Sequence, residues 1–255
     1  QAKNTTLIDL CVRAAMRRHD TPGAAVAVID GGELVFEQGF GVKRRGADDP
    51  VGADTAFRIG SVTKQLTAAA VMQQVDAGAV DLDDPVTRYI PELALVPRFG
   101  SDRLTVRHLL THTAGYPDNF TDIVGPTGPD ALSDWVAGER GIELHAPPGE
   151  FWNYSNPNFS LAGLVVERAS GIPYHRYMRE RLFTPAGLTH TTLEPADVIA
   201  GGDWTWGHAE SPVTGAEKKL SVAVAGNVSV PVVARTALAS GPPPGASAQT
   251  SNLTA

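Results

Sequence analysis

One stretch of the chain places a nucleophilic side chain at the start of a helix. Residues 61–64 read Ser61-Val62-Thr63-Lys64, and an alanine-rich run follows at residues 68–72. In a helix, residues three apart lie on one face, so the Ser61 hydroxyl and the Lys64 ammonium can touch. The positive end of the helix dipole also faces the Ser61 oxygen. The stretch predicts a helix over residues 61–77 with a serine nucleophile near its first turn.

The same tetrapeptide has a purely structural interpretation. Serine is a favoured N-cap, and Lys64 could be a solvated residue of the first turn, although a cation is misplaced at that end of a helix. Further along the chain, the tripeptide Tyr154-Ser155-Asn156 adds a phenol and an amide. By itself such a tyrosine could equally be a half-buried aromatic residue in a loop. Together the two signals point to serine acyl-transfer chemistry.

The composition describes a globular protein. The chain has 255 residues, of which 42% are hydrophobic, enough to bury the core of one large domain or two interleaved subdomains. The net charge is -7, and no basic run exceeds Arg44-Arg45 or Lys218-Lys219. Nucleic acid is therefore excluded as an expected partner, because the basic surface that it requires is lacking.

The chain shows no sequence signal for a disulfide or a membrane span. Its single cysteine, Cys11, excludes an intrachain disulfide and a cysteine-based zinc site. Cys11 lies on an amphipathic helix, and we expect it in the core. Residues 1–4 carry no signal-peptide hydrophobic region, and no apolar run is long enough to cross a membrane. We expect a soluble chain.

The order of the expected elements is two strands followed by a long helical region. A first helix over residues 5–19 has apolar positions Leu7, Leu10, Cys11, Ala14 and Ala15 at helical spacing. The turn Asp30-Gly31-Gly32 joins two β-rich runs into a hairpin, and helical patterns follow later. The expected strands are residues 24–29 and 33–40, and the expected later helices are 61–77, 105–112, 129–137, 158–170 and 173–182.

Two segments are rich in proline or glycine. Residues 81–99 contain Pro85, Pro91 and Pro97, which predicts an extended excursion across the surface of the helical part. Residues 240–251 combine Gly-Pro-Pro-Pro-Gly with small polar residues and predict a loop or linker. A hairpin alone does not make a stable sheet, so further strands should complete it.

Two other patterns are weaker candidates for chemistry. His108 and His112 have the spacing of a metal pair, but no glutamate follows His108 and no third ligand is evident, so we interpret both as structural. Trp204 and Trp206 alternate with polar residues, which is typical of a strand face or the wall of a pocket.

Several motifs, in one order along the chain, resemble a known family. They are residues 57–64 around Ser61, Leu82-Asp83-Asp84-Pro85-Val86, residues 105–115 with the segment Leu110-Thr111-His112-Thr113-Ala114-Gly115, Pro148-Gly149, Tyr154-Ser155-Asn156, and Phe183-Thr184-Pro185-Ala186-Gly187-Leu188. This set is similar to the penicillin-recognising serine hydrolases. The most similar branch groups class C β-lactamases, Streptomyces-type DD-peptidases, D-aminopeptidases and β-lactamase-like esterases.

The resemblance implies a fold and a division of the chain. The fold class is α/β of the β-lactamase/transpeptidase type, with an antiparallel sheet flanked by helices and a mainly helical subdomain. Residues 1–60 would give the first helix and two strands of the α/β subdomain. Residues 61–239 would give the nucleophile helix and the helical subdomain, and residues 240–255 a linker-like end. The sheet would be incomplete in this chain.

The resemblance also implies a role for four side chains. Ser61 would attack an acyl carbonyl and form an acyl-enzyme, and Lys64, buried rather than solvated, would assist removal of its proton. Tyr154 would be the general base, with its phenolate favoured by the Lys64 cation. Asn156 would donate its amide to a substrate carbonyl and fix Lys64. The mechanism requires no metal and no organic cofactor.

The third motif of the family, Lys-Thr-Gly or His-x-Gly, is absent from the chain. That motif lies on a strand that lines the site and supplies the second oxyanion N–H. The nearest sequence, Arg44-Arg45-Gly46, comes before Ser61, in the wrong order. Residues 250–255 resemble the start of the helix that precedes the motif. We therefore expect a second polypeptide or a missing C-terminal segment to carry it.

Two functions remain open on the sequence. The first is a serine hydrolase that acts on D-amino-acid peptides, β-lactams or small esters and needs a complementary C-terminal segment. The second is a non-catalytic binding or interaction module that keeps this fold. The family resemblance favours a secreted or periplasmic location. A small molecule or peptide is the expected substrate.

Overall fold

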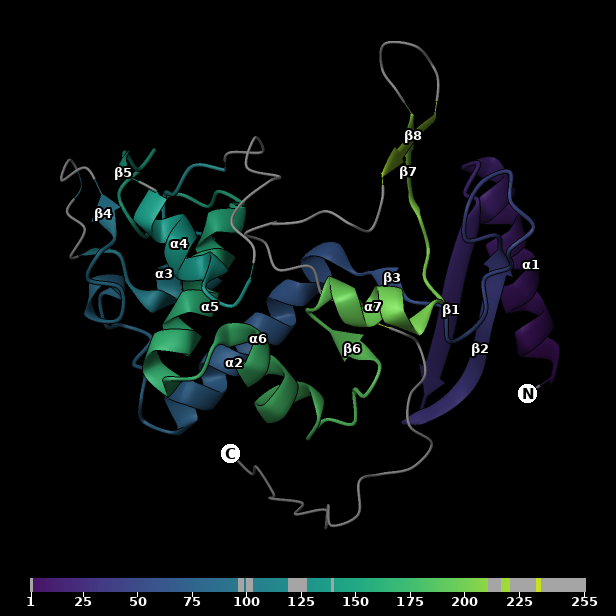
Figure 1. Ribbon diagram of the computed structural model, residues 1–255, viewed down its shortest axis with the longest axis horizontal. Helices are drawn as coiled ribbons and strands as arrows, with labels where there is room; N and C mark the ends of the chain where they lie inside the picture. Colours follow the sequence, from purple (N-terminus) through teal and green to yellow (C-terminus); the bar gives the residue numbers. More distant parts are fainter. Residues whose placement is uncertain are drawn as a thin grey trace.

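The structure is a computed structural model that describes residues 2–95, 99, 103–118, 128–138, 140–210, 217–220 and 233–234. Figure 1 shows two groups of elements, a helix with a β-hairpin at one side and a cluster of helices at the other. Short strands and the helix α7 (Pro195–Gly201) lie between them. The predicted linker at residues 240–251 and the segment 250–255 fall outside the described residues.

The hairpin forms as the sequence predicts. Strand β1 (Gly23–Asp30) pairs antiparallel with β2 (Glu33–Gly41), with a register shift at Val28/Ile29. The loop is Gly31-Gly32, and both residues have positive φ, 59° and 85°. Two left-handed residues give the turn twist that matches the twist of the strands, and glycine adopts this conformation without steric cost. Among the described residues, β1 and β2 pair only with each other.

Helix α1 (Ala2–Arg18) lies beside the hairpin but turns a different stripe toward it than the sequence suggested. The half-buried apolar residues are Ile8, Val12 and Met16. Leu7 and Leu10 are 60% and 57% exposed, and Cys11 is exposed as well, so its predicted place in the core is wrong. The helix is apolar on two adjacent stripes, and contacts with β2 select one of them. One such contact is the bond from Gln38 to the Asp9 carboxylate, 3.2 Å.

The helical part follows with short connections. Its elements are the 3-10 turn η1 (Gly60–Val62), α2 (Thr63–Asp76), η2 (Val86–Arg88), β4 (Ala94–Leu95), α3 (Val106–Leu110), α4 (Ala131–Gly138), β5 (Arg140–Ile142), α5 (Asn156–Ser170), α6 (Tyr174–Tyr177) and the π-helical turn η4 (Met178–Phe183). Each predicted helix has a counterpart, with α3 shorter than expected and the helix expected over residues 173–182 divided into α6 and the π-helical η4. Helix α5 ends at Gly171, whose φ of 67° gives a left-handed cap.

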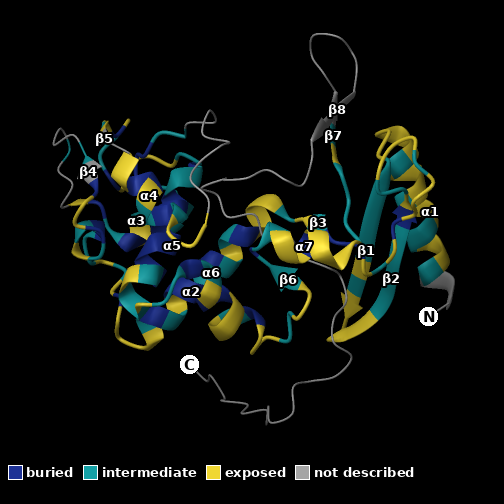
Figure 2. Ribbon diagram, viewed as in Figure 1, coloured by how far each residue is buried: buried dark blue, intermediate teal, exposed yellow. Residues whose placement is uncertain are grey.

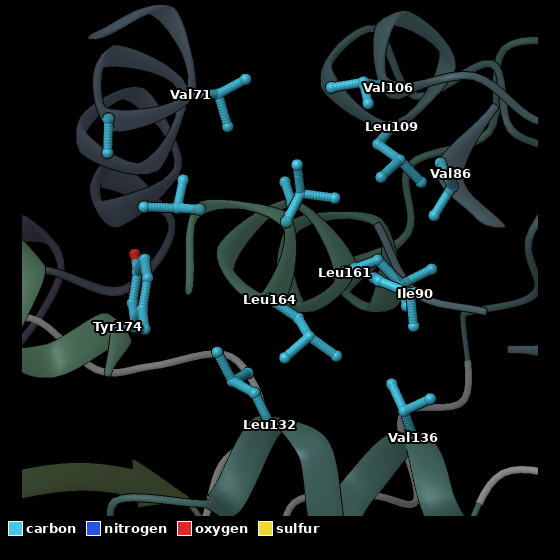
Figure 3. Close-up of a cluster of buried hydrophobic side chains, with 14 of the residues drawn as sticks. Val71, Val86, Ile90, Val106, Leu109, Leu132, Val136, Leu161, Leu164 and Tyr174 are labelled. Carbon is cyan, nitrogen blue, oxygen red and sulfur yellow. The ribbon is translucent and has the colours of Figure 1, made fainter. Parts of the chain in front are cut away.

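One hydrophobic core fills this helical part, with α5 running through it. Figure 3 shows Leu161 and Leu164 of α5 surrounded by side chains from α2, α3, α4 and η2. Residues 161–166 are buried throughout, so α5 is covered on all sides. Figure 2 shows how burial differs across the molecule. The buried residues, drawn in dark blue, gather in the helical part, and few lie in the hairpin. The core therefore fixes the two helices that begin at Thr63 and Asn156.

The proline-rich segment 81–99 contributes to that core, contrary to the predicted surface excursion. Val86 and Ile90 are fully buried and Leu93 is 5% exposed. The backbone N–H of Val86 donates to the Leu104 carbonyl, 2.8 Å, which holds the segment against the residues before α3. Proline restricts the backbone but does not prevent neighbouring apolar side chains from packing inward. The number of prolines in a segment therefore does not predict whether that segment is buried.

Buried hydrogen bonds join α2 to α6 and η4. The Thr67 hydroxyl and the Tyr174 hydroxyl lie 2.8 Å apart, and Gln74 donates to the Tyr177 hydroxyl at 2.7 Å. Complete burial raises the pKa of Tyr174 to about 12, partly offset by the bond to Thr67. The interface between these helices thus combines apolar contacts with polar pairs that have fixed partners.

Short strands connect the two groups of elements. Strand β9 (Val233–Ala234) pairs with both β3 (Phe57–Arg58) and β6 (Thr191–Thr192), and β7 (Gly207–Glu210) pairs with β8 (Glu217–Leu220). The Lys43 ammonium bonds Asp49 and Asp203, both at 2.9 Å, and ties the end of the hairpin to the segment after α7. None of the helices in the described part of the chain is long and apolar enough to cross a membrane.

Candidate active site

Ser61 lies in η1, one turn before the regular part of α2, and its side chain is exposed. Its hydroxyl does not cap the helix, because the N-cap residues of η1 and α2 are Ile59 and Val62, and neither element has a side-chain cap bond. Instead the Ser61 Oγ lies 2.6 Å from the Tyr154 hydroxyl. The structural interpretation of Ser61 as an N-cap is therefore wrong, and the hydroxyl faces a group that can take its proton.

Lys64 connects the other predicted residues. Its Nζ lies 3.3 Å from the Ser61 Oγ and 2.7 Å from the Asn156 Oδ1, and it sits 4.7 Å from the centroid of the Tyr154 ring. The side chain is half-buried rather than fully buried. The spacing of three residues on α2 brings the ammonium to the serine, as the sequence predicts.

The segment from Tyr154 to Asn156 changes from an extended loop to a helix at the site. Ser155 is extended, with φ -146° and ψ 124°, and α5 begins at Asn156 with Pro157 in its first turn. Proline is favoured there because its missing N–H would have no partner. Ser155 is fully buried, and its hydroxyl donates to the Pro117 carbonyl at 3.2 Å. The start of a core helix therefore positions both Tyr154 and Asn156.

Asp118 holds Asn156 in place, a role that the sequence analysis missed. One carboxylate oxygen accepts from the Asn156 backbone N–H at 2.9 Å and from its Nδ2 at 3.3 Å. These two bonds orient the Asn156 amide so that its Oδ1 faces the Lys64 ammonium. The Nδ2 that was expected to meet a substrate carbonyl thus spends one of its two hydrogens on Asp118. Asp118 follows the motif at residues 105–115, but no local pattern relates it to a residue 38 positions later.

His112 also touches the site, although the sequence analysis interpreted it as structural. Its ring lies 4.6 Å from the Tyr154 ring and 5.1 Å from the Phe159 ring, centroid to centroid. Burial, and then the charge of Lys64, lower its pKa, against a smaller opposing effect of Asp118. His108 lies in the first turn of α3, before His112, and its Nδ1 closes a capping box with Thr105. Burial lowers its pKa also.

The described residues hold no group of three or more metal-ligating side chains. Two cavities lie away from Ser61. One, of about 290 Å³, is lined by Lys43, Arg58 and Trp206 among others. The second, of about 380 Å³, is lined by residues of η4, β6 and α7. Trp206 lines the first cavity, in keeping with the predicted pocket wall, whereas Trp204, whose ring centroid lies 4.9 Å from that of Trp206, packs against Ala56 and Val198. Neither cavity includes the four candidate residues.

The arrangement has the parts of a serine acyl-transfer site. Ser61 supplies a nucleophile, Tyr154 a proton acceptor within hydrogen-bond distance, and Lys64 a cation that contacts both. Asn156 orients the cation. All four come from the N-terminal ends of α2 and α5, the two helices at the centre of the core.

Comparison with known proteins gives one consistent family. The family model described as Beta-lactamase matches residues 8–253. Penicillin-binding protein 4 of Amycolatopsis lactamdurans is 35% identical over 186 residues, which are 73% of this chain and 48% of that protein. Protein flp of Staphylococcus aureus (strain COL) is 27% identical over 73% of this chain and 38% of its own. The chain thus spans about half the length of these relatives, or less.

The solved structures agree on the fold. An octameric penicillin-binding protein homologue from Pyrococcus abyssi superimposes with a TM-score of 0.79 and 26% identity, over 91% of this chain and 53% of that one. A beta-lactamase/D-alanine carboxypeptidase from Pseudomonas syringae gives 0.72 and 24%, over 91% and 62%, and supports the fold alone. The predicted β-lactamase/transpeptidase-like fold is confirmed, with a sheet that remains open in the described residues.

Proposed function

The chain belongs to the beta-lactamase family, and on that premise we propose that it is a serine hydrolase that forms an acyl-enzyme on Ser61. The proposal rests on one observation. The Tyr154 hydroxyl lies 2.6 Å from the Ser61 Oγ, and the Lys64 Nζ lies 3.3 Å from the same oxygen. A binding module has no need for a nucleophile beside a proton acceptor and a cation, so the geometry favours catalysis over the alternative function.

The proposed reaction has two steps. In the first, the Tyr154 oxygen, in the deprotonated form that a general base requires, takes the Ser61 proton as the Ser61 Oγ bonds to the carbonyl carbon of an amide or ester. The bond from that carbon to the leaving nitrogen or oxygen then breaks, and Tyr154 gives the proton to the leaving group. In the second, water gives a proton to Tyr154 as its oxygen bonds to the acyl carbon, the bond from that carbon to the Ser61 Oγ breaks, and Tyr154 returns the proton to Ser61 as the acid is released. Lys64, whose Nζ lies 3.3 Å from the Ser61 Oγ, assists removal of the Ser61 proton and stabilises negative charge on the reacting oxygens.

Asn156 and Asp118 would keep this cation aimed at Ser61. Lys64 has a long flexible side chain, and the 2.7 Å bond to the Asn156 Oδ1 fixes where its charge lies. Asp118 fixes Asn156 in turn. The hydrogen of the Asn156 Nδ2 that is not bonded to Asp118 would be free to meet a substrate carbonyl.

The proposed substrates are D-amino-acid peptides, β-lactams or small esters. Penicillin-binding protein 4, whose name describes binding of penicillin, is the relative that supports β-lactams. The name of the Pseudomonas syringae protein adds D-alanine peptides. A secreted or periplasmic location is proposed on the resemblance to this family alone.

We propose that a further segment completes the site. The Ser61 backbone N–H can serve as one oxyanion donor, and efficient acyl transfer normally uses two. The second would come from a strand with a Lys- or His-x-Gly sequence, carried by a second polypeptide or by a C-terminal extension. In this division residues 1–60 belong to the α/β subdomain, 61–239 carry the nucleophile helix and the helical subdomain, and 240–255 connect onward.

Intact-mass measurement after exposure to penicillin tests the proposal. We expect one covalent adduct on the purified protein and none on Ser61→Ala. The matched control is Ser133→Ala, whose hydroxyl lies in α4 and donates to the Asp130 carbonyl. That variant should be labelled like the wild type. An adduct that survives in Ser61→Ala, or no adduct with any β-lactam, D-alanyl peptide or activated ester, would count against the proposal.

A denaturing gel of the same material tests the completing segment. A second band that co-purifies and contains a Lys- or His-x-Gly sequence supports a second polypeptide. A single band longer than this chain supports an extension. Rapid acylation by residues 1–255 alone would show that no additional segment is needed.

A further inference from the structure

The His112 ring makes more contacts with the Tyr154 segment than a core histidine needs. It lies 4.6 Å from the Tyr154 ring at an interplanar angle of 32° and 6.3 Å from the Trp152 ring at 77°. Its Nδ1 lies 3.2 Å from the backbone nitrogen of Ser155. His112 therefore contacts the segment on both sides of the peptide bond that follows Tyr154.

These hydrogen bonds define the protonation state of the ring. A backbone N–H can only donate, so the Nδ1 that meets Ser155 must carry a lone pair, and the proton of the neutral ring is on Nε2. The Nδ2 of Asn158 lies 3.3 Å from the same Nδ1 and donates to it as well. Both neighbours thus fit a neutral imidazole.

The backbone of His112 is held in a costly conformation. Its φ of 57° is left-handed, and Asp20 is the only other described residue besides glycines with positive φ. The His112 carbonyl accepts from the Asn153 backbone N–H at 2.8 Å. Both the backbone and the ring of His112 therefore bond to the segment that carries Tyr154. The strained backbone conformation is what allows His112 to make both bonds.

We propose that His112 is a positioning residue that, as a neutral imidazole with its proton on Nε2, holds the Tyr154 hydroxyl against Ser61 and releases it on protonation. A proton on Nδ1 would face the Ser155 N–H, donor against donor, inside a buried site. The buried Oδ1 of Asn158 has no hydrogen-bond partner among the described residues, so a turn of that amide would offer the new N–H an acceptor. The Ser155 backbone N–H would then lose the acceptor that it has in the neutral form of His112.

The charges around His112 favour the neutral form. Lys64 of α2 opposes a second cation, whereas Asp118, from the segment after α3, attracts one more weakly. Tyr154 is the titratable group of the loop before α5, and α5 itself contributes only the neutral Asn158 and Phe159. Burial and Lys64 lower the pKa of His112, so the release on protonation should occur below the ordinary histidine range.

The test compares His112→Asn, His112→Leu and the control His108→Asn in the purified protein with any chain that accompanies it. Asparagine tolerates positive φ and can accept from the Ser155 N–H through its Oδ1, but it does not titrate. Leucine removes the acceptor. His108→Asn removes a nearby histidine whose Nδ1 contacts Thr105 rather than the Tyr154 segment. Acylation by a fluorescent penicillin gives the rate constant and the dissociation constant of the noncovalent complex at each pH.

We expect His112→Leu to slow acylation about 100-fold with little change in that dissociation constant, since small misplacements of reacting groups have effects of this size. His112→Asn should retain most of the rate at neutral pH and lose the fall in rate on acidification that the wild type and His108→Asn share. An acid fall that persists in His112→Asn, or a His112→Leu variant as fast as His108→Asn, would overturn the inference.

The inference rests on the proposed function, so a readout independent of activity is needed. The nitrogen chemical shifts of His112 should show an unprotonated Nδ1 and a protonated Nε2 at neutral pH. If the wild type fails to acylate, the proposed function fails, and the shifts still decide whether His112 binds the segment as described. A proton on Nδ1 at neutral pH would contradict the positioning role whatever the activity.

Discussion

The helical part and the hairpin layer of this molecule are stabilised to very different extents. In the helical part, a single cluster of buried side chains extends from Ala70 to Leu193. In residues 5–51, for which burial is described, the buried hydrophobic residues are only Phe40 and Val51, and α1 leaves Leu7 and Leu10 more than half exposed. All four candidate catalytic and binding side chains belong to the helical part. The proposed catalytic residues thus lie in the region that has its own hydrophobic core.

The hairpin layer has the features of a surface that needs further contacts. Strands β1 and β2 pair only with each other in the described residues, and a two-stranded hairpin is marginal in water. The Ile29 and Leu34 side chains near its turn are also exposed. Exposed apolar groups of this kind mark surfaces that pack against other structure. The completing segment that we propose would use this layer, and the site would receive its remaining groups from there.

The largest expected effect separates the two regions by chemistry. We expect Tyr154→Phe and Lys64→Met each to slow acylation by about 10³-fold, because each removes a group from one proton path. The double variant should be slower by less than the product of the two. The control Arg13→Met removes a cation from α1 and should acylate at the wild-type rate. Stopped-flow labelling measures all four, and fully multiplicative losses would contradict a shared path.

The next effect separates the two regions by stability. Leu164→Ala, which empties a fully buried position in α5, should lower the free energy of unfolding by about 3 kcal/mol. Leu10→Ala, the same change at a position 57% exposed, should alter it by less than about 0.5 kcal/mol. Urea titration followed by circular dichroism measures both. A large loss in Leu10→Ala would show that the exposed stripe of α1 is covered in solution.

Those parts of the fold and of the candidate site that depend on neighbours in the chain could be predicted from the sequence. The parts that depend on distant residues could not. The Gly31-Gly32 turn and the spacing of Ser61 and Lys64 depend on neighbours in the chain, and both are as expected. The stripe of α1 that faces β2 depends on residues far away, and the prediction chose the wrong one. The Asp118 bonds and the contact between His112 and Tyr154 likewise join distant segments, so no local pattern contained them.

A smaller effect concerns how the helical part orients Lys64. Asp118→Ala should slow acylation about 10-fold, because Asn156 loses both bonds that direct its Oδ1 to the ammonium. Asp118→Asn keeps an acceptor oxygen and should lose less. Asp134→Ala, at an exposed position in α4, removes the same charge and serves as the control. Equal rates for the two alanine variants would show that Asp118 acts only through its charge or not at all.

The smallest expected effect is a pH dependence of stability in the helical part. The pKa values of His108 and His112 are lowered mainly by burial, so at pH values just below the ordinary histidine range the unfolded chain binds more protons than the folded one. Stability is therefore full above that range and is lost as pH falls through it toward the lowered values. Melting temperatures measured at several pH values should decline on acidification.

The double variant His108→Asn/His112→Asn should show a flatter decline in melting temperature than the wild type. The control His19→Asn, at an exposed position just beyond α1, should leave the slope unchanged. An unchanged slope in the double variant would place the acid sensitivity elsewhere, for example in carboxylates bonded to arginine.

The polar pairs between α2 and the helices beside it have a consequence for how far Ser61 projects. Apolar helix surfaces can slide along one another at modest cost, and each residue of slip would move the nucleophile by about 1.5 Å along the axis. The Thr67–Tyr174 and Gln74–Tyr177 pairs oppose such slip, because it would strand buried hydroxyl and amide groups without partners. With a pKa of about 12, Tyr174 stays un-ionised at any pH at which a hydrolase works. Its hydrogen bond to Thr67 is therefore not lost by titration. The axial position of Ser61 is thus fixed by buried contacts about two turns and about four turns along the helix from the reacting hydroxyl.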